Sequence, residues 1–233
     1  MNNILEPLRL SRGSHQPGSG EGCAMNVISW ENGDVEITDY PECSDMFLAS
    51  IVQVVNDRLA DEDGHLSAED SMKVLDLGHR TVGTSYHGLS VGQLKVVYVR
   101  CAALSAKKVV HLTGDPASYI LLIAAVERWA DNPTEENRVA AREIATRTPI
   151  KLTEPPAESS SIWAAYSAGL NQPVGYEGWR SFLGAIDTNP DPYYALGLAH
   201  EIIDLFIELT GADTEYKLPV PLEVAVEKML VKS

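Results

Sequence analysis

The residues best suited to chemistry lie near the start of the chain, around a glycine-rich segment. His15, Cys23, Asp39 and Cys43 supply an imidazole, two thiols and a carboxylate. An imidazole can take the proton whose loss makes a thiol nucleophilic, and the same four groups could complete a tetrahedral zinc shell. Their spacing matches no known zinc or protease signature, so a third interpretation stays open, in which the cysteines are small buried hydrophobes. For a zinc site, we predict Cys23, Cys43 and His15 as ligands.

The glycine-rich segment is itself a candidate functional loop. Backbone N–H groups at such a loop, where it leads into a helix, can hold an anion. A phosphate-binding loop needs Gly-Lys-Ser/Thr after its second glycine, whereas this chain has Gly-Ser-Gly-Glu, and Glu21 would repel an anion. We therefore favour a structural role over nucleotide binding. The residues of this candidate loop are Gly13, Ser14, His15, Gly22 and Cys23.

Two further groups of residues have weaker signals. His200-Glu201, followed by Asp204, is one residue short of the zinc-protease motif, and we interpret it as the solvated side of an amphipathic helix. In the second, His79, Arg80, Tyr86 and His87 lie in a glycine-containing stretch, where they could bind phosphate or act as acid and base. A helix-to-helix connection with incidental histidines is the interpretation that we favour.

The N-terminal pattern resembles an uncharacterised family found in actinomycetes and their phages. The residues that carry the resemblance are Gly13-Ser14-His15, Gly22, Cys23, Met25, Trp30, Asp39, Pro41, Cys43 and Asn56-Asp57. They span about residues 9–57, and the chain departs from the family at Asn26 and Tyr40, where an acidic residue and a histidine are expected. The resemblance implies a helical, alanine-rich remainder and a phage or actinobacterial accessory protein, with no activity to transfer.

Charge and composition exclude several classes of protein. The chain has 18 Lys and Arg against 33 Asp and Glu, a net charge of −15, which argues against binding to a nucleic-acid backbone. Its longest apolar run, residues 119–126, is far shorter than the roughly 20 residues of a membrane span. Three cysteines do not form a secreted disulfide framework, and residues 1–20 lack a signal-peptide pattern. We expect a cytoplasmic protein without membrane contact.

Apolar periodicity and capping residues predict a mainly α fold, an orthogonal helical bundle with at most a small β element. Helices are expected over 46–59, 66–79 and 192–209, with further helix starts at Asp115-Pro116 and Asn132-Pro133. Residues 94–112 could be helix or strand because they are rich in β-branched residues. A proline- and serine-rich connection at 148–161 suggests an N-terminal helical part, 1–150, and a C-terminal helical part, 151–233, packed as one unit.

No complete catalytic constellation emerges from these patterns. We therefore predict a non-enzymatic accessory protein that binds a macromolecular partner or assembles with itself. One alternative is a small-molecule or metal-dependent enzyme with its site at His15, Cys23 and Cys43. A second alternative is an acidic mimic that captures a nucleic-acid-binding protein.

Overall fold

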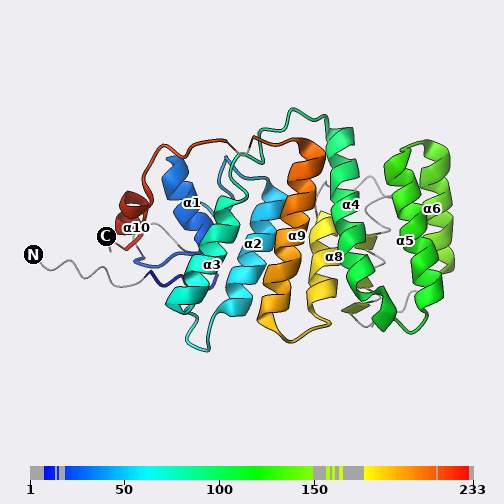
Figure 1. Ribbon diagram of the computed structural model, residues 1–233, viewed down its shortest axis with the longest axis horizontal. Helices are drawn as coiled ribbons and strands as arrows, with labels where there is room; N and C mark the ends of the chain where they lie inside the picture. Colours follow the sequence, from blue (N-terminus) through cyan, green and yellow to red (C-terminus); the bar gives the residue numbers. More distant parts are fainter. Residues whose placement is uncertain are drawn as a thin grey trace, which may run out of the picture. The chain divides into compact units, whose positions relative to one another are not determined.

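The chain is mainly helical in the parts that its computed structural model describes (Figure 1), namely residues 8–13, 15, 19–148, 156–157, 159–160, 163–164, 176–213 and 215–230. The helices are α1 (Ala24–Asn32), α2 (Met46–Leu59), α3 (Ala68–His79), α4 (Val91–Val109), the 3-10 turn η1 (Val110–Leu112), α5 (Pro116–Asp131), α6 (Glu135–Arg147), α8 (Tyr176–Ile186), α9 (Pro192–Thr210) and α10 (Leu222–Leu230). Extended pairing within the described residues is limited to two isolated bridges, Ser11 with His65 and Ser44 with Val82. The mainly α prediction is confirmed.

The chain divides into two compact units. Unit 1 comprises residues 1–87, 195–203 and 212–233, and unit 2 comprises 88–194 and 204–211, so that α9 supplies residues to both. The boundary expected at residues 150–151 lies outside the described residues, as does most of the proline- and serine-rich connection. None of the described helices is long and apolar enough to cross a membrane.

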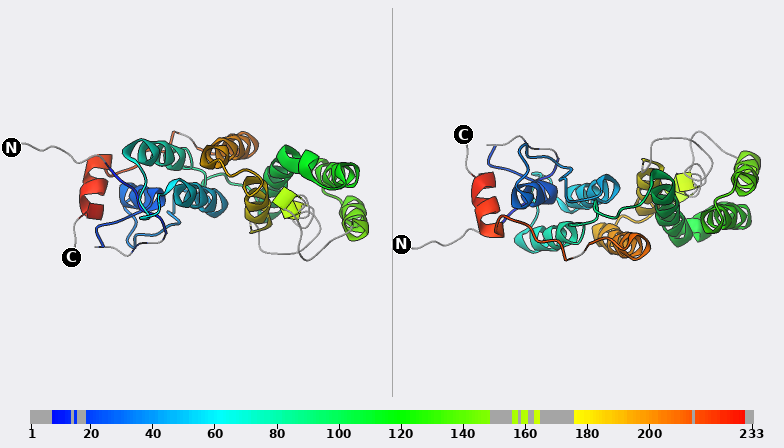
Figure 2. Two further views of the ribbon diagram at one scale, coloured as in Figure 1. Left: turned by 90° about the horizontal axis from the view of Figure 1, so that it is seen from below. Right: turned by 90° about the horizontal axis from the view of Figure 1, so that it is seen from above.

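Unit 1 is built on close approaches to α1. Gly78 of α3 faces this helix so closely that a Cβ on it would lie 3.4 Å from Ile28 and 3.8 Å from Ala24. On another side α10 packs on α1, where the Lys228 ammonium lies 5.4 Å from the centre of the Trp30 ring. Figure 2 shows α1, α2 and α3 side by side in unit 1. The missing side chain at Gly78 therefore lets α3 pack closely against α1.

The helix starts follow the capping rules. The carboxylates of Asp45, Asp115 and Asp191 accept backbone N–H bonds at the starts of α2, α5 and α9. One expected cap is wrong, because α6 begins after Thr134, whose hydroxyl accepts from the Asn137 N–H. Asn132 instead ends α5, since Pro133 cannot donate the next helical hydrogen bond. The sequence therefore predicted a helix start in this region correctly but placed its cap two residues too early.

Residues 91–109 form a helix, which settles the question left open by their β-branched residues. A capping box opens α4, in which the Ser90 hydroxyl accepts from the Gln93 N–H and the Gln93 side chain accepts from the Ser90 N–H. The β-branched residues lie partly on the buried side, where Val97 and Val99 are inaccessible to solvent or nearly so. Capping and packing together outweigh the weak strand propensity.

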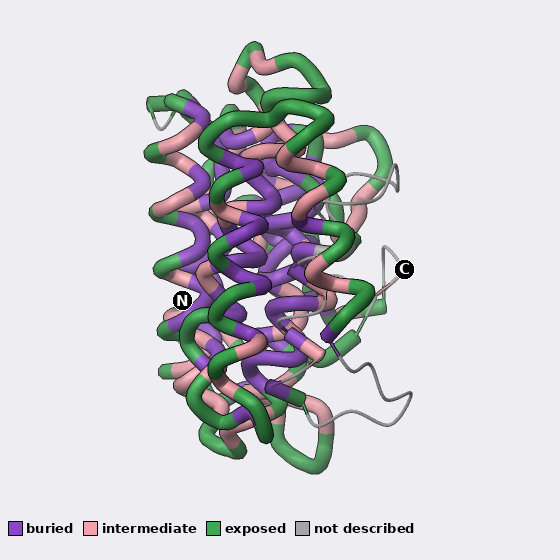
Figure 3. Tube along the Cα trace, turned by 90° about the vertical axis from the view of Figure 1, so that its right-hand side faces the viewer, coloured by how far each residue is buried: buried purple, intermediate pink, exposed green. Residues whose placement is uncertain are grey.

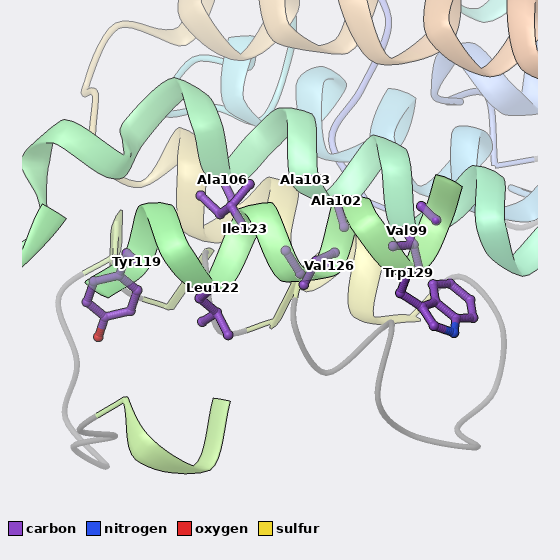
Figure 4. Packing of buried hydrophobic residues seen from close by; sticks show 11 residues of the cluster. Val99, Ala102, Ala103, Ala106, Tyr119, Leu122, Ile123, Val126 and Trp129 are labelled. Atoms are coloured by element: carbon purple, nitrogen blue, oxygen red, sulfur yellow. The ribbon is translucent and has the colours of Figure 1, made fainter. Parts of the chain in front are cut away.

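The core of unit 2 is lined with alanine. Helix α4 packs against α5 (Figure 4), with Ala102, Ala103 and Ala106 of α4 in one cluster with Ile123 and Val126 of α5. Small residues on one helix and larger ones on the other let the two axes approach closely. Helices α6 and α8 pack on α5 and α4 respectively. Figure 3 shows the result, with buried and exposed residues alternating along the helices on that side of the molecule.

Candidate functional site

The segment before α1 is held in place by backbone hydrogen bonds to residues far along the chain. The Ser11 N–H donates to the Gly22 carbonyl at 2.9 Å, and the Leu66 N–H donates to the Leu10 carbonyl at 2.9 Å. The Gly13 N–H donates to the Asp57 carboxylate at 2.9 Å, with a positive φ of 89° at Gly13. The positive φ explains why a glycine stands at residue 13, and the bonds join Leu10, Ser11 and Gly13 to residues elsewhere in the chain.

Asn56 joins this segment to α1 from inside the protein. Its side chain is fully buried, accepts from the Ala24 N–H at 3.3 Å and donates to the Ser11 carbonyl at 2.9 Å. It therefore pairs one of the N–H groups that a helix start leaves without a partner. The Asn56-Asp57 pair noted in the sequence thus works as a structural clamp.

Cys23, Asn26 and Asp39 meet at the start of α1 and form the polar centre of unit 1. The Cys23 thiol donates to the Asp39 carboxylate at 3.5 Å, and the Asn26 amide donates to the same oxygen at 2.9 Å. The Asn26 side-chain oxygen also accepts from the Cys23 N–H at 3.1 Å. An acidic residue at position 26 could not donate to Asp39, so asparagine fits this arrangement better than the family pattern.

The polar centre disfavours a nucleophilic thiol. Burial, and then the charge of Asp39, raise the pKa of Cys23 to about 12. Burial raises the pKa of Cys43 to about 11. Since the thiolate is the reactive form, both thiols are unreactive near neutral pH. The geometry therefore supports the interpretation of these cysteines as small buried hydrophobes, and Cys101 is buried as well.

The predicted zinc ligands find different surroundings. Cys43 lies by the Ser44 hydroxyl, which in turn is 2.8 Å from that of Thr81, whereas Cys23 faces Asp39. His15 has one ring nitrogen 3.7 Å from the Glu21 carboxylate and the other buried without a partner. Within the described residues, no group of three or more His, Cys, Asp or Glu side chains could hold a metal ion. The zinc site therefore remains an untested prediction.

Gly22 and Ser14 are the remaining residues of the candidate loop. Gly22 packs against α10, where a Cβ on it would lie 2.4 Å from the sulfur of the flexible Met229 side chain, so that a larger residue would have to displace this side chain. Ser14 lies outside the described residues. What the structure shows of this loop is a folded segment with internal bonds and close contacts, which agrees with the structural role favoured from its sequence.

The side chains of the histidine-containing stretch at the end of α3 have different partners in the fold. His79 pairs with the buried carboxylate of Glu31 at 2.7 Å, and the Arg80 guanidinium donates to the His200 ring. Tyr86 packs against Tyr216, with 5.2 Å between ring centroids. The groups that could have acted together as acid, base and phosphate ligand thus have separate partners.

The Glu31–His79 pair is a short, largely buried contact between a carboxylate and an imidazole. Burial opposes the charged form of the imidazole, but the hydrogen bond and the charge of Glu31 outweigh burial and raise the pKa of His79. Glu31 is only 4% exposed, so its carboxylate needs this partner. The pair ties α1 to α3.

On α9, Glu201 and Asp204 are exposed, while Ala199, Ile202 and Ile203 are buried. This agrees with the interpretation of the first two as the solvated side of the helix, since buried and exposed positions alternate with the helical period. The His200 ring is held by Arg80. The arrangement therefore gives no support to a protease-like zinc site.

A feature that the sequence patterns did not single out lies in unit 2, on the side of α5 turned away from its core. Ile120 and Leu121 are 53% and 63% exposed, and Ala117 and Ala124 are exposed on the same side of the helix. Tyr119, Leu122, Ile123 and Val126 fill the opposite side (Figure 4). We call Ala117, Ile120, Leu121 and Ala124 the α5 outer face. It is an exposed apolar stripe of the kind that marks binding surfaces.

The sequence did contain a signal for this face. The run 119–126 is apolar at every position, whereas a helix with one buried side should interrupt its apolar residues with polar ones. The run is also too short to span a membrane. In the structure this helix has one side buried and leaves the other side, with Ile120 and Leu121, open to solvent.

The two units also differ in charge. Unit 1 has 8 Lys and Arg against 20 Asp and Glu, a net charge of −12, whereas unit 2 has 10 against 13, a net charge of −3. The acidity of the chain is thus concentrated in the unit that contains the polar centre. The α5 outer face belongs to the nearly neutral unit, where a partner of either sign can approach.

Comparison with known proteins gives no match: no family model, no curated protein and no solved structure matches the chain.

Proposed function

We propose that this chain is a non-enzymatic accessory protein that acts by binding a macromolecular partner or another copy of itself, with the α5 outer face as its contact surface. The observation that supports this proposal is the exposure of Ile120 and Leu121 between Ala117 and Ala124 on a well-packed helix. Exposed aliphatic side chains in a continuous stripe have a hydration cost that a partner removes.

The polar centre supports the non-enzymatic part of the proposal. Its thiol has a strongly raised pKa, and its amide and carboxylate are used in bonds to each other and to Cys23 at the start of α1. An enzyme at Cys23 would need the opposite arrangement, a thiolate stabilised by a cation. The free, buried cysteines fit a reducing cytoplasm, and the N-terminal resemblance suggests an actinobacterial or phage source.

A second candidate function rests on the charge of unit 1. With a net charge of −12, this unit could capture a basic protein, as an acidic mimic of nucleic acid does. Such binding would weaken steeply as salt is added, because surface charges are screened within about 10 Å at 0.1 M salt. Binding through the α5 outer face would change little with salt.

Native mass spectrometry on protein purified from its own host tests the main proposal. We expect a complex in the wild type that is lost in Leu121→Glu and kept in Met72→Glu, which adds the same charge to an exposed helix position of unit 1. A bound metal or small molecule that is lost in Cys23→Ser or His15→Ala would contradict the proposal. It would support the enzyme alternative.

A further inference from the structure

The α5 outer face has an internal symmetry. Residues 117, 120, 121 and 124 lie on one side of a helix with 3.6 residues per turn. Their order is small, large, large, small: alanine, isoleucine, leucine and alanine. The two alanines lie the same number of residues from the midpoint between Ile120 and Leu121. The face therefore reads almost the same in both directions along the helix.

A surface with this symmetry fits an antiparallel copy of itself. When two α5 helices cross at that midpoint, Ala117 of each copy meets Ala124 of the other, and Ile120 meets Leu121. The alanines at both ends let the two axes approach closely, so that the larger side chains interlock at the centre. A two-fold axis at this point gives the closed symmetry of most homodimers.

The charges beside the face agree with the antiparallel arrangement. Arg128 is exposed on the same side of α5, one turn after Ala124. In the antiparallel pair it comes level with the start of the second copy's α5, where Asp115 is exposed. Hydrogen bonds from Ser118 lower the pKa of this carboxyl, so it is charged at neutral pH. A parallel pair would instead place Arg128 beside Arg128.

The distribution of charge also favours unit 2 as the place where two copies meet. Two chains of net charge −15 repel each other, and most of that charge belongs to unit 1. Contact through unit 2, with a net charge of −3, brings the least charged surfaces together. Other macromolecules could use the face, but none is favoured by both its symmetry and its charges.

We propose that the α5 outer face is a homodimer interface in which α5 packs antiparallel against α5 of a second copy, with the two-fold axis near Ile120 and Leu121. This proposal rests on the proposed function and names its partner. One helix face covers less area than the roughly 800 Å² that each partner contributes to a standard interface. The dimer is therefore weak and forms as concentration rises.

Sedimentation velocity from about 1 µM to 1 mM tests the proposal on the full chain. We expect the weight-average mass to rise from 25.4 kDa toward twice that value. Leu121→Glu places two carboxylates together at the two-fold axis and should raise the dissociation constant at least tenfold. Met72→Glu, the matched control in unit 1, should raise it less than twofold. Circular dichroism establishes that both variants are folded.

Cross-linking tests the direction of the helices. A mixture of Ala117→Cys and Ala124→Cys chains should form disulfide heterodimers faster than either variant forms homodimers. The natural cysteines are buried and compete little. Faster homodimers of each variant would mean a parallel pair and would overturn the proposal.

A constant mass of 25.4 kDa over the whole range would also overturn it, as would equal weakening by Leu121→Glu and Met72→Glu. A chain that is monomeric alone but loses a host complex in Leu121→Glu would overturn the homodimer and leave the proposed function standing. If Leu121→Glu lost neither self-association nor a host complex, the result would contradict both the homodimer and the proposed function.

Discussion

Unit 1 and unit 2 are both built from helices but bury different side chains. In unit 2, every buried polar side chain that the structure describes is a serine or a threonine, and the core is alanine and larger apolar residues. Unit 1 also buries Asn26, Glu31, Asp45 and Asn56, each with a hydrogen-bonding partner. Polar residues of this kind are often taken as signs of an active site.

The comparison shows that the part of a chain richest in reactive residue types need not be the part that acts. In unit 1 many of those residues bond to the starts of helices and to the backbone of Ser11 and Gly13. In unit 2 the buried serines and threonines are mostly bonded to backbone carbonyls, and the α5 outer face leaves two neighbouring aliphatic side chains exposed. Four predictions would break or sharpen this contrast.

The largest effect is expected in the apolar core of unit 2. Phe182 is fully buried, and Phe182→Ala should lower the free energy of unfolding by about 4 kcal/mol, because it removes a large apolar side chain and leaves a cavity. Ile120→Ala, in the same unit but on the exposed face, should cost about 0.5 kcal/mol or less. Urea denaturation measures both. Similar losses in the two variants would mean that the α5 outer face is covered within the chain.

In unit 1, the next largest effect is expected at Gly83, which approaches backbone rather than side chains. Its φ is +85°, and a Cβ on it would lie 1.8 Å from the Asp213 carbonyl oxygen. Gly83→Ala should therefore cost about 3 kcal/mol. Gly64 has a φ of +83° with nothing within 4 Å, so Gly64→Ala should cost only about 1 kcal/mol. Thermal denaturation of the pair separates contact from backbone strain, and equal losses would refute the close approach.

The Asn56 clamp should contribute somewhat less to the free energy of unfolding. Asn56→Ala leaves the Ala24 N–H and the Ser11 carbonyl without partners inside the protein, and we expect a loss of about 2 kcal/mol. Hydrogen exchange should show faster exchange of the Ser11 and Ala24 amides. The control is Gln53→Ala, which removes a partly buried bond to the Asp39 carbonyl and should cost about half as much. No change in exchange near residue 11 would contradict the clamp.

The smallest effect is a pH dependence at His79. Its pKa is raised in the folded protein, so the Glu31 pair stabilises fully below the unfolded value of about 6.5 and loses this contribution as pH rises through the folded pKa. Glu31→Gln should therefore lower the free energy of unfolding more at pH 5.5 than at pH 9. NMR titration should show a lower pKa of His79 in the variant. An unchanged pKa of His79 in the variant would mean that Glu31 is not the cause of its rise.

The sequence was informative about helices and less so about what their side chains do. The helix start expected at Asp115-Pro116 is confirmed, because a capping group acts on its own backbone neighbours. The proline at 133 drew the expected cap two residues too early. The roles of Asn56 and Gly22 could not be predicted, since each depends on a contact with residues far along the chain.

The candidate site shows the same limit. The sequence grouped Cys23 with His15, Asp39 and Cys43 by residue type, but the chemistry of Cys23 depends first on its burial and then on the charge of Asp39, which both raise the pKa of its thiol. The α5 outer face was visible as an uninterrupted apolar run. Which side of that run would be covered depends on how α4, α5 and α6 pack, which no local pattern specifies.

One comparison tests the central claim most directly, namely that the polar centre holds the fold and the α5 outer face binds. Native mass spectrometry and melting temperature are measured together for Cys23→Ala and Leu121→Glu, with protein from its own host. We predict that Cys23→Ala melts several degrees lower and keeps the complex of the wild type, whereas Leu121→Glu loses the complex and melts as the wild type does in its uncomplexed state. The account would be contradicted by the reverse, a complex or bound ligand lost from a fully stable Cys23→Ala and retained by Leu121→Glu.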